Sequence, residues 1–585
     1  MKTTSKSKIL QTTSTQPRKT RPRKLVWAVV ALPLLALTFW TMMAQEGPGA
    51  EASAQLSQGT AESAHQVVLG DLPQFTAPAR LPVAIPLRGP DFNLTRTGVP
   101  PTGVTGNPSP VPDAATGVKT TPGTNTSFLG EDEAACGFFI PSDHALATSG
   151  SYEVQVINSC ITVFSPSGIP FSGFPKSLNA FFGAPAGDNV SDPRALYDWL
   201  NGRFIVVAED FSANNILVAA SQSSNPTLGW NIYAISGNSG GLAGGADFPM
   251  LGQTVKEIGD SKGGIYVSFD RFNSSGFFVD DVVWILPKTP IYAGAGFSFN
   301  IFFNLNVGGS TQDHVQPANV MNRGDQPDSE FLINTKDFNA GCSSISSPCN
   351  GLVVWAIHHG IGSGASLTGK VISTANNYAQ PFTAAQPGAA SGTTCAINTG
   401  FVGISGGVTW SGGDLYAAAT SANFTGNAAD GWIYWQVHPY LNTSGSITSA
   451  TIRNEIFWGK FGFGSNTTFS EYYPTPQPDD EGNVTVVANY SSNANFPSTL
   501  FVAQRTTQPT GKFPDGGLTL ASGAAFYCQR DRQGRNRWGD YTAASPFGSS
   551  IAPFPEFWFA GQFSESSGNW GTRIGKNGYS TPAAQ

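Results

Sequence analysis

A pair of short apolar strands recurs along the chain, and this repeat limits the possible fold more than any other feature. In the first copy, Ser191 to Ile235, the turn-forming pair Asn201-Gly202 precedes the β-rich run Phe204–Val207, and Asn231–Ile235 follows as an outer strand. Five later copies keep this order at irregular intervals, as expected when long, variable loops join the strands. They pair Ile265–Ser268 with Val282–Ile285, Phe331–Asn334 with Leu352–Ile357, Leu415–Ala418 with Trp432–Trp435, Val484–Val487 with Leu500–Ala503, and Phe557–Ala560 with Trp570–Ile574.

Small antiparallel sheets of this kind cannot each bury both faces alone, and stacking them around an axis solves the problem. We therefore predict an all-β fold, a six- or seven-bladed β-propeller over residues 131–578. An earlier hairpin, Tyr152–Ile157 with Cys160–Phe164, gives seven blades if it is a blade and six if it only completes the last sheet. The alternative is a row of β-sandwich domains, but the Pro/Ser-rich linkers that it requires are not seen after residue 130.

The N-terminal part indicates export. Residues 1–24 carry eight lysines and arginines and no acid, and residues 25–44 form an uncharged run of 20 residues, about the length of a membrane span. The charge bias predicts a cytoplasmic N-terminus with the body outside. The run is a signal anchor or a signal peptide, so the body is membrane-anchored or, after cleavage, secreted. Residues 45–130 are rich in Pro, Gly and Thr, which predicts a disordered spacer.

The net charge of the whole chain is −7, although residues 1–24 contribute eight positive charges and no negative ones. The rest of the chain is therefore strongly acidic. A protein that binds nucleic-acid backbones needs clustered lysine and arginine, so this class of partner is excluded. In an exported body, six cysteines predict three disulfides. Cys342 with Cys349 is the safest pair, Cys136 with Cys160 would pin the first hairpin, and Cys395 with Cys528 would link distant repeats.

Acidic residues stand just before several innermost strands, in Ser191-Asp192-Pro193, Asp247-Phe248-Pro249 and Gly539-Asp540. Glycoside hydrolysis on a propeller needs two or three carboxylates that converge at its mouth. Asp192, Asp247 and Asp540 are therefore the candidate catalytic residues. The competing interpretation is structural, because a carboxylate before a strand can bind nearby main-chain amides and recurs when the blade recurs. The candidate ligand-binding residues are Arg194, Gln316 and Arg537.

The sequence predicts no metal site and no cofactor. It contains no CxxC motif, which argues against zinc. The run Asp479 to Asn483 carries oxygen ligands that suit calcium but lacks the spacing of a dedicated calcium loop. Because Gly482 and Asn483 tolerate positive φ, a hairpin turn is the better interpretation of this run.

Several segments of the chain resemble segments of a group of other proteins. Asp479–Val484, Asn536–Tyr541 and Trp570–Ile574, together with SDPRALYD and DFPMLG, resemble segments of exported bacterial propeller-like proteins of unassigned function, with the shape of the sialidase-like or BNR-like superfamily. The resemblance spans most of residues 136–576. It implies a propeller fold and no particular activity. The S-x-D-x-G-x-x-W boxes that a sialidase would carry are absent.

Two functions remain open. The preferred hypothesis is a cell-surface-tethered propeller, attached through residues 25–44, that binds carbohydrate or protein without turnover, since loops on a rigid scaffold tend to carry function. The alternative is an extracellular glycoside hydrolase that uses the three aspartates. On the sequence alone the protein is treated as a binding module rather than an enzyme, and a purely structural role in an envelope assembly is a third possibility.

Overall fold

The computed structural model describes residues 52–76, 120–321, 323–336, 342–424, 428–459, 469–531, 533–547 and 555–579, and the backbone of residues 83–84. Strands dominate these residues, and their two α-helices are short, α2 (Leu178–Phe182) and α3 (Lys288–Ala293). The prediction of an all-β protein is therefore confirmed. The same residues contain no helix with the length and apolarity needed to span a membrane, and the predicted segment 25–44 lies outside them.

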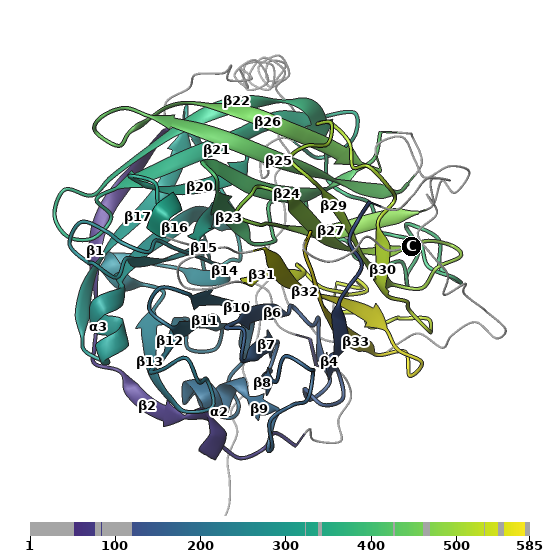
Figure 1. Cartoon of the computed structure of the whole chain (residues 1–585), viewed down its shortest axis with the longest axis horizontal. Helices are drawn as coiled ribbons and strands as arrows, with labels where there is room; N and C mark the ends of the chain where they lie inside the picture. Colours follow the sequence, from purple (N-terminus) through teal and green to yellow (C-terminus); the bar gives the residue numbers. More distant parts are fainter. Residues whose placement is uncertain are drawn as a thin grey trace, which may run out of the picture. The chain divides into compact units, whose positions relative to one another are not determined.

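The described strands pair into antiparallel units that we number sheets 1 to 7 along the chain (Figure 1). Sheet 1 contains β6 (Ala145–Thr148), β7 (Glu153–Ile157), β8 (Cys160–Phe164) and β9 (Lys176–Ser177). Sheet 2 contains β10 (Val190–Asp198), β11 (Arg203–Asp210), β12 (Asn215–Ser221), β13 (Gly229–Ser236) and β2 (His65–Val68). Sheet 3 contains β14 (Gly245–Gln253), β15 (Gly264–Phe272), β16 (Phe278–Pro287), β17 (Phe297–Val307) and β1 (Ala52–Ala61).

The remaining sheets follow the same plan. Sheet 4 contains β19 (Gln316–Val320), β20 (Glu330–Thr335), β21 (Cys349–His358) and β22 (Ser366–Tyr378). Sheet 5 contains β23 (Val408–Ser411), β24 (Asp414–Ala422), β25 (Asp430–Leu441) and β26 (Ile447–Trp458). Sheet 6 contains β27 (Ser470–Pro478), β28 (Val484–Ser491), β29 (Ser498–Gln504) and β30 (Leu518–Ala521). Sheet 7 contains β31 (Ala543–Phe547), β32 (Glu556–Ser564), β33 (Trp570–Asn577) and β4 (Thr126–Asp132).

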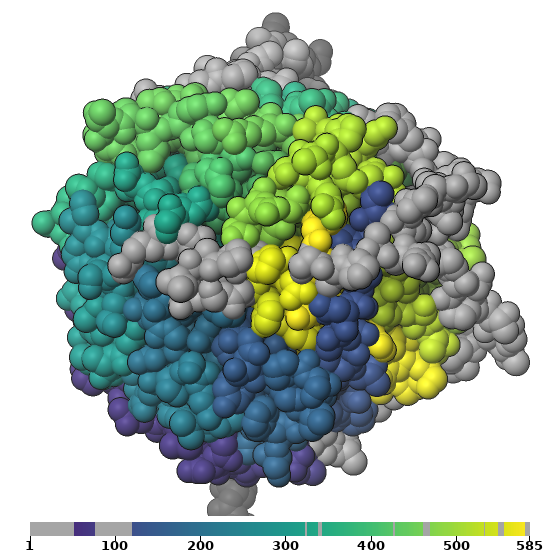
Figure 2. Space-filling view, viewed as in Figure 1, coloured from purple at the N-terminus to yellow at the C-terminus, as the bar shows by residue number. Residues whose placement is uncertain are grey.

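The innermost strands hold the sheets in a closed, propeller-like ring. β14, β19 and β23 are joined by parallel pairing, and contacts continue from β23 to β27, β31, β6, β10 and back to β14. The ring closes through β4, which comes early in the chain and pairs with the C-terminal strand β33. In Figure 2 the C-terminal strands accordingly lie beside the segment that begins near residue 120. Separate β-sandwich domains in a row would not make these contacts.

Apolar residues alternate along the strands so that each sheet packs against both of its neighbours. On β11, Phe204 and Val206 join a cluster shared with sheet 1, whereas Ile205 and Val207 join a cluster shared with sheet 3. Five more clusters repeat this arrangement between sheets 3 and 4, 4 and 5, 5 and 6, 6 and 7, and 7 and 1. The core is thus a series of layers between neighbouring sheets.

All six predicted strand pairs lie within one sheet each, and one of them is not a pair of direct neighbours. Five of the six pairs are direct neighbours in their sheets, for example β15 with β16. Phe204–Val207 and Asn231–Ile235 share a sheet, but β12 lies between them. The first hairpin is β7 with β8, and it belongs to a sheet of its own while β4 completes the last sheet.

The prediction of a disordered spacer over residues 45–130 is wrong for three parts of that range. β1 pairs with β17, β2 pairs with β13, and β4 pairs with β33. β1 is largely polar and β2 has only four residues, and both lie at the outer edge of their sheets, so neither shows the apolar alternation that identifies a strand in sequence.

All three predicted disulfides are present: Cys136–Cys160, Cys342–Cys349 and Cys395–Cys528. Disulfides persist in oxidising compartments, and their presence indicates an extracytoplasmic body. The pattern of six cysteines alone permitted several other pairings.

A buried ammonium group joins sheets 2 and 3 at the end of β10 and β14. Lys288 Nζ donates hydrogen bonds to Asp198 Oδ2 at 2.8 Å, to Gln253 Oε1 at 2.7 Å and to the Thr254 carbonyl at 2.7 Å. Its side chain is fully buried. We expect Lys288→Met to lower the free energy of unfolding by about 3 to 5 kcal/mol, because it leaves the Asp198 carboxylate buried and without its counter-charge. Urea unfolding checks this, and a loss below about 1 kcal/mol would contradict it.

A buried carboxyl group in sheet 6 makes stability depend on pH. Glu471 accepts a hydrogen bond from Trp432 Nε1 at 2.9 Å, and burial raises its pKa to about 8. In the unfolded chain this group ionises near its ordinary pKa of 4.5, whereas in the folded protein it stays neutral up to about pH 8. The folded state is therefore fully stabilised by the neutral group below pH 4.5 and loses this stabilisation as the pH rises towards 8. The loss is about 1.4 kcal/mol per pH unit for one proton.

We therefore expect Glu471→Gln to remove part of the decline in unfolding free energy between pH 5 and pH 8. Denaturant unfolding of both proteins at several pH values measures the difference. Parallel pH profiles for the two proteins would refute the assignment to Glu471.

Candidate active site

Several innermost strands begin with a residue in the left-handed backbone region. Three of these residues, Asp192, Phe248 and Tyr473, are each followed by a proline. The pairing register of the strand shifts at the same place, which marks a β-bulge. Bulges change the direction of a side chain, and strained backbone of this kind is frequent at functional sites. The non-glycine residues with positive φ at these starts are Asp143 (35°), Asp192 (52°), Phe248 (57°), His314 (49°) and Tyr473 (58°).

Carboxylates from four sheets meet at this end of the innermost strands. Asp143 Oδ1 accepts a hydrogen bond of 2.6 Å from the main-chain N–H of Asp540, although the two are 397 residues apart. One carboxylate oxygen of Asp192 lies within 4.8 Å of one from Glu209 and one from Asp247. We call these five groups the axial carboxylates: Asp143, Asp192, Glu209, Asp247 and Asp540.

Asn158 links the two halves of this cluster. Its Nδ2 donates to Asp143 Oδ2 at 2.7 Å, and its Oδ1 accepts from the main-chain N–H of Asp192 at 2.8 Å. All five axial carboxylates are buried, and the most exposed, Asp540, is only 5% exposed. Carboxylates at this depth interact more strongly than they would in water, so their charges are coupled.

Two arginines lie beside the cluster in different roles. Arg537 Nη2 forms an ion pair of 2.7 Å with Asp540 Oδ2. Arg194 donates from Nε to the Pro249 carbonyl at 3.0 Å and from Nη1 to the Ser405 carbonyl at 2.8 Å, and its guanidinium carbon lies 3.5 Å from the centre of the Tyr541 ring. Arg537 therefore neutralises a carboxylate, whereas Arg194 ties neighbouring strands together.

The environment places a proton on this cluster near neutral pH. Burial and, after it, the charge of Asp540 raise the pKa of Asp143, Arg537 and two hydrogen bonds oppose the rise, and the resulting pKa is about 7. Burial also raises the pKa of Asp192 well above its ordinary value, and Asp143, Asp247 and Asp540 add to this rise. A carboxylic acid with a pKa near 7, next to a carboxylate paired with arginine, is an arrangement that can both donate and accept a proton.

Asp270 of sheet 3 extends the acidic cluster towards His314, which precedes the innermost strand of sheet 4. Asp270, the strand partner of Asp247, has its Oδ2 3.2 Å from His314 Nδ1 and accepts the main-chain N–H of His314 at 3.1 Å through Oδ1. Burial raises the pKa of Asp270, the charge of His314 lowers it and that of Asp313 raises it, and the resulting pKa is about 7. The His314 ring packs against Phe401 with a centroid distance of 4.3 Å.

The structure brings together all three candidate catalytic aspartates, Asp192, Asp247 and Asp540, so they do not occupy separate turns. Arg194 and Arg537 lie with them. Gln316 is buried on β19, and no described interaction joins its side chain to the axial carboxylates. The run at Asp479 is a hairpin turn, in which Asp479 Oδ1 accepts the main-chain N–H groups of Glu481 and Asn483.

Sequence reasoning missed Asp143 and Glu209. A signal for Asp143 was present, because the dipeptide Ser142-Asp143 precedes β6 just as Ser191-Asp192 begins β10. Glu209 carried no comparable signal, since it lies inside the apolar strand β11 and reaches the cluster only because it pairs with Ser191.

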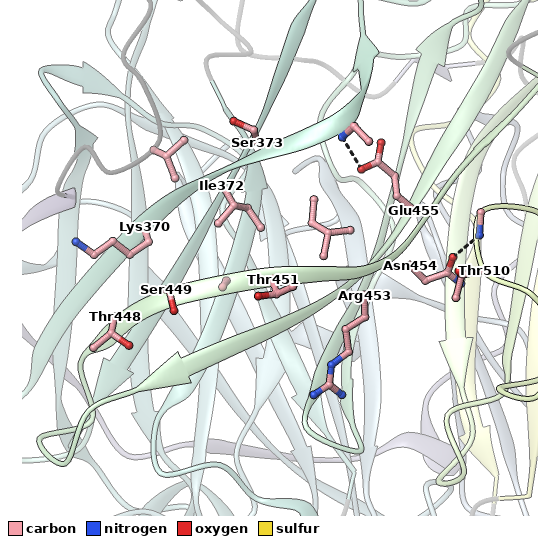
Figure 3. A pocket seen from close by; sticks show the side chains of 15 residues that line it. Lys370, Ile372, Ser373, Thr448, Ser449, Thr451, Arg453, Asn454, Glu455 and Thr510 are labelled. Atoms are coloured by element: carbon pink, nitrogen blue, oxygen red, sulfur yellow. Dashed lines mark hydrogen bonds between the residues drawn. The ribbon is translucent and has the colours of Figure 1, made fainter.

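An open cavity lies elsewhere, between the outer strands β22 and β26 of sheets 4 and 5. Its volume is about 780 Å³, and Figure 3 shows Lys370, Thr451 and Arg453 among its lining residues. Glu455 is held there by the main-chain N–H groups of Ala375 and Asn376. The cavity is lined by both polar and apolar residues, and none of the axial carboxylates is among them.

Comparisons with known proteins give only distant likenesses. No protein-family model and no curated protein matches the chain. Among solved structures, a protein of unknown function from Dyadobacter fermentans is 8% identical, covers 78% of this chain and 100% of its own, and has a TM-score of 0.30. An exo-β-1,3-galactanase from Clostridium thermocellum is 12% identical, with coverage of 68% and 82% and a TM-score of 0.26.

A GH43 endo-arabinanase from Bacillus licheniformis is also 12% identical, with coverage of 62% of this chain and 93% of its own and a TM-score of 0.25. TM-scores this far below 0.5 are too low for a fold or an activity to be inferred from the likeness. The proposals below therefore come from the chain's own residues.

Proposed function

We propose that this chain is an extracytoplasmic, seven-bladed β-propeller that hydrolyses glycosidic bonds, with Asp143 as general acid and Asp540 as general base or nucleophile. The blade number comes from sheets 1 to 7, each counted as one blade. The observation that carries the activity is the approach of two acidic residues that lie far apart in the sequence, since the Asp143 carboxylate accepts the main-chain N–H of Asp540 at 2.6 Å.

The two groups have the different environments that this chemistry needs. A glycosidase requires one protonated carboxyl group for the leaving oxygen and one ionised carboxylate on the other side of the sugar ring. The raised pKa of Asp143 supplies the proton at neutral pH. The Asp540 side chain is held by Arg537, whose Nη2 lies 2.7 Å from Asp540 Oδ2.

Asp192 and Asp247 are assigned a supporting role in this proposal. Their carboxylates adjoin the pair and complete an acidic surround, which favours the positive charge that develops on the sugar ring in the transition state. The active site is therefore built from sheets 1, 2, 3 and 7.

The test is a panel of aryl glycosides of common hexoses and pentoses, and of the corresponding polysaccharides, with the full chain between pH 5 and pH 8. We expect turnover of at least one glycoside class, and its loss in Asp540→Asn. Product stereochemistry, followed by NMR, then assigns Asp540 as nucleophile (retention) or base (inversion). Turnover that is unchanged in both Asp143→Asn and Asp540→Asn would refute the assignment.

A second candidate function is carbohydrate binding without turnover in the groove between β22 and β26. The observation in its favour is that this groove is open to solvent and lined by both polar and apolar residues, in contrast to the buried axial carboxylates. Retention on a glycan array that is lost in Lys370→Ala, but kept in Asp540→Asn, would support it. No retention on any glycan would exclude it.

A further inference from the structure

We propose that Asp192, Glu209 and Asp247 bind a divalent cation of the calcium type between sheets 2 and 3. This site is separate from the proposed catalytic pair, Asp143 and Asp540, and its cation binding does not depend on hydrolysis. The cation would fix the start of β10 against the start of β14, and thereby the acidic surround of the active site.

The three side chains have the spacing of ligands to one ion. One oxygen from each carboxylate lies within 4.8 Å of the other two. Oxygen ligands sit 2.3 to 2.6 Å from calcium, so two ligands of one ion are at most about 5 Å apart. Glu209 comes from β11, which pairs with β10, while Asp247 comes from the innermost strand of the next sheet.

The Asp192 carboxylate supplies an independent indication of a ligand. The residue is 2% exposed, and among the described residues its Oδ2 has no hydrogen-bond partner. Buried polar atoms in native proteins are nearly always bonded, and buried charges are paired or coordinate metals. Asp143 and Asp540 differ in this respect, because each has a partner for its carboxylate.

The backbone at Asp192 has an unusual conformation that is held in place by a neighbouring side chain. Its φ of 52° lies in the left-handed region, and its main-chain N–H is held by Asn158 Oδ1 at 2.8 Å. This conformation costs a non-glycine residue about 1 to 3 kcal/mol, and it persists only where the surrounding structure imposes it. The charge of Arg194 acts on this carboxylate, but the Nε and Nη1 of Arg194 donate to main-chain carbonyls and not to Asp192.

The ligand atoms define the class of metal. Three carboxylates offer only hard oxygen donors, which suit calcium or magnesium, whereas zinc and copper prefer nitrogen and sulfur. Calcium accepts irregular geometry and completes its shell with carbonyl oxygens and water, but magnesium demands a near-ideal octahedron. A set drawn from three different strands is therefore expected to favour calcium.

The test uses the full chain, stripped with EDTA and dialysed into metal-free buffer. Calorimetric titration with CaCl₂ is expected to show one equivalent of calcium bound per chain. Thermal unfolding in excess CaCl₂ is expected to give a higher Tm than unfolding in the metal-free buffer. MgCl₂ is expected to bind at least about 10-fold more weakly. Asp192→Asn, Glu209→Gln and Asp247→Asn should each weaken calcium binding at least about 10-fold, since each removes one charge from the shell. Glu471→Gln, a buried carboxyl group in sheet 6, serves as the matched control and should bind as the wild type does.

Two results would overturn the proposal. One is the absence of calcium binding together with a Tm that is indifferent to calcium. The other is stoichiometric binding that all three variants retain, which would place the ion at a different site. If a variant does not fold, a crystal of the wild-type chain soaked in TbCl₃ decides instead: an anomalous peak at the three carboxylates supports the site, and its absence there refutes it.

Failure of this test and failure of the proposed hydrolase are distinguishable. The calcium titration reports binding and Tm whether or not any glycoside is turned over. Conversely, turnover that depends on Asp143 and Asp540 would stand even if no calcium bound.

Discussion

Asp143→Asn is expected to lower kcat/KM for unactivated glycosides by about 10²- to 10⁴-fold, the usual contribution of a general acid. Asn keeps the size of the side chain and an oxygen that can accept the Asp540 N–H, but it has no acidic proton for the leaving oxygen. The measurement is kcat/KM on one glycoside class with leaving groups of different acidity. Aryl glycosides with very acidic leaving groups need little protonation, so the loss for these substrates should be much smaller.

Asp540→Asn should give a different signature. It removes the attacking or water-activating carboxylate, so kcat/KM should fall for poor and good leaving groups alike. Glu471→Gln should leave both classes unchanged, and circular dichroism of each variant shows whether the fold is retained. If Asp143→Asn lowers the rates of both substrate classes equally, the acid role of Asp143 is wrong. If Asp540→Asn retains wild-type rates, its role is wrong too.

Removal of the Cys395–Cys528 disulfide is expected to lower the free energy of unfolding by about 5 kcal/mol. The bond closes a loop of 133 residues, and the entropy that a disulfide removes from the unfolded chain grows with the length of the loop. The double variant Cys395→Ser/Cys528→Ser is compared with the wild type by urea unfolding without reductant. The matched control is Cys342→Ser/Cys349→Ser, whose loop spans 7 residues and for which the same relation gives about 2 kcal/mol.

The longer disulfide should also affect the active site. Asn536 Nδ2 donates to the Cys395 carbonyl at 3.0 Å, and Arg537 Nη1 lies 3.4 Å from Asn398 Oδ1. The segment that carries Arg537 and Asp540 is thus attached to the loop of Cys395. We expect the Cys395/Cys528 variant to lose hydrolysis at temperatures where the Cys342/Cys349 variant keeps it. Equal losses of stability in the two variants would contradict the loop-length explanation.

Much of each sheet could be predicted from local sequence. The alternation along β11, in which Phe204 and Val206 face one neighbour and Ile205 and Val207 face the other, is a property of residues next to one another. Turn residues such as Asn201-Gly202 fix the hairpin that follows, so most neighbouring strands could be paired correctly. The strand β12 (Asn215–Ser221) was not predicted, although its residues Ile216–Ala220 are apolar and buried.

The sequence also placed Asp192, Asp247 and Asp540 at the starts of innermost strands, because a polar residue and a proline or glycine mark each start. Only the tertiary structure decided which carboxylates meet. Asp143 reaches Asp540 because β4 closes the ring between the first and last sheets, and β1 and β2 extend sheets whose other strands lie far along the chain. Such contacts depend on the number of sheets and on the closure of the ring, and neither is encoded in the short-range alternation of apolar residues that defines a strand.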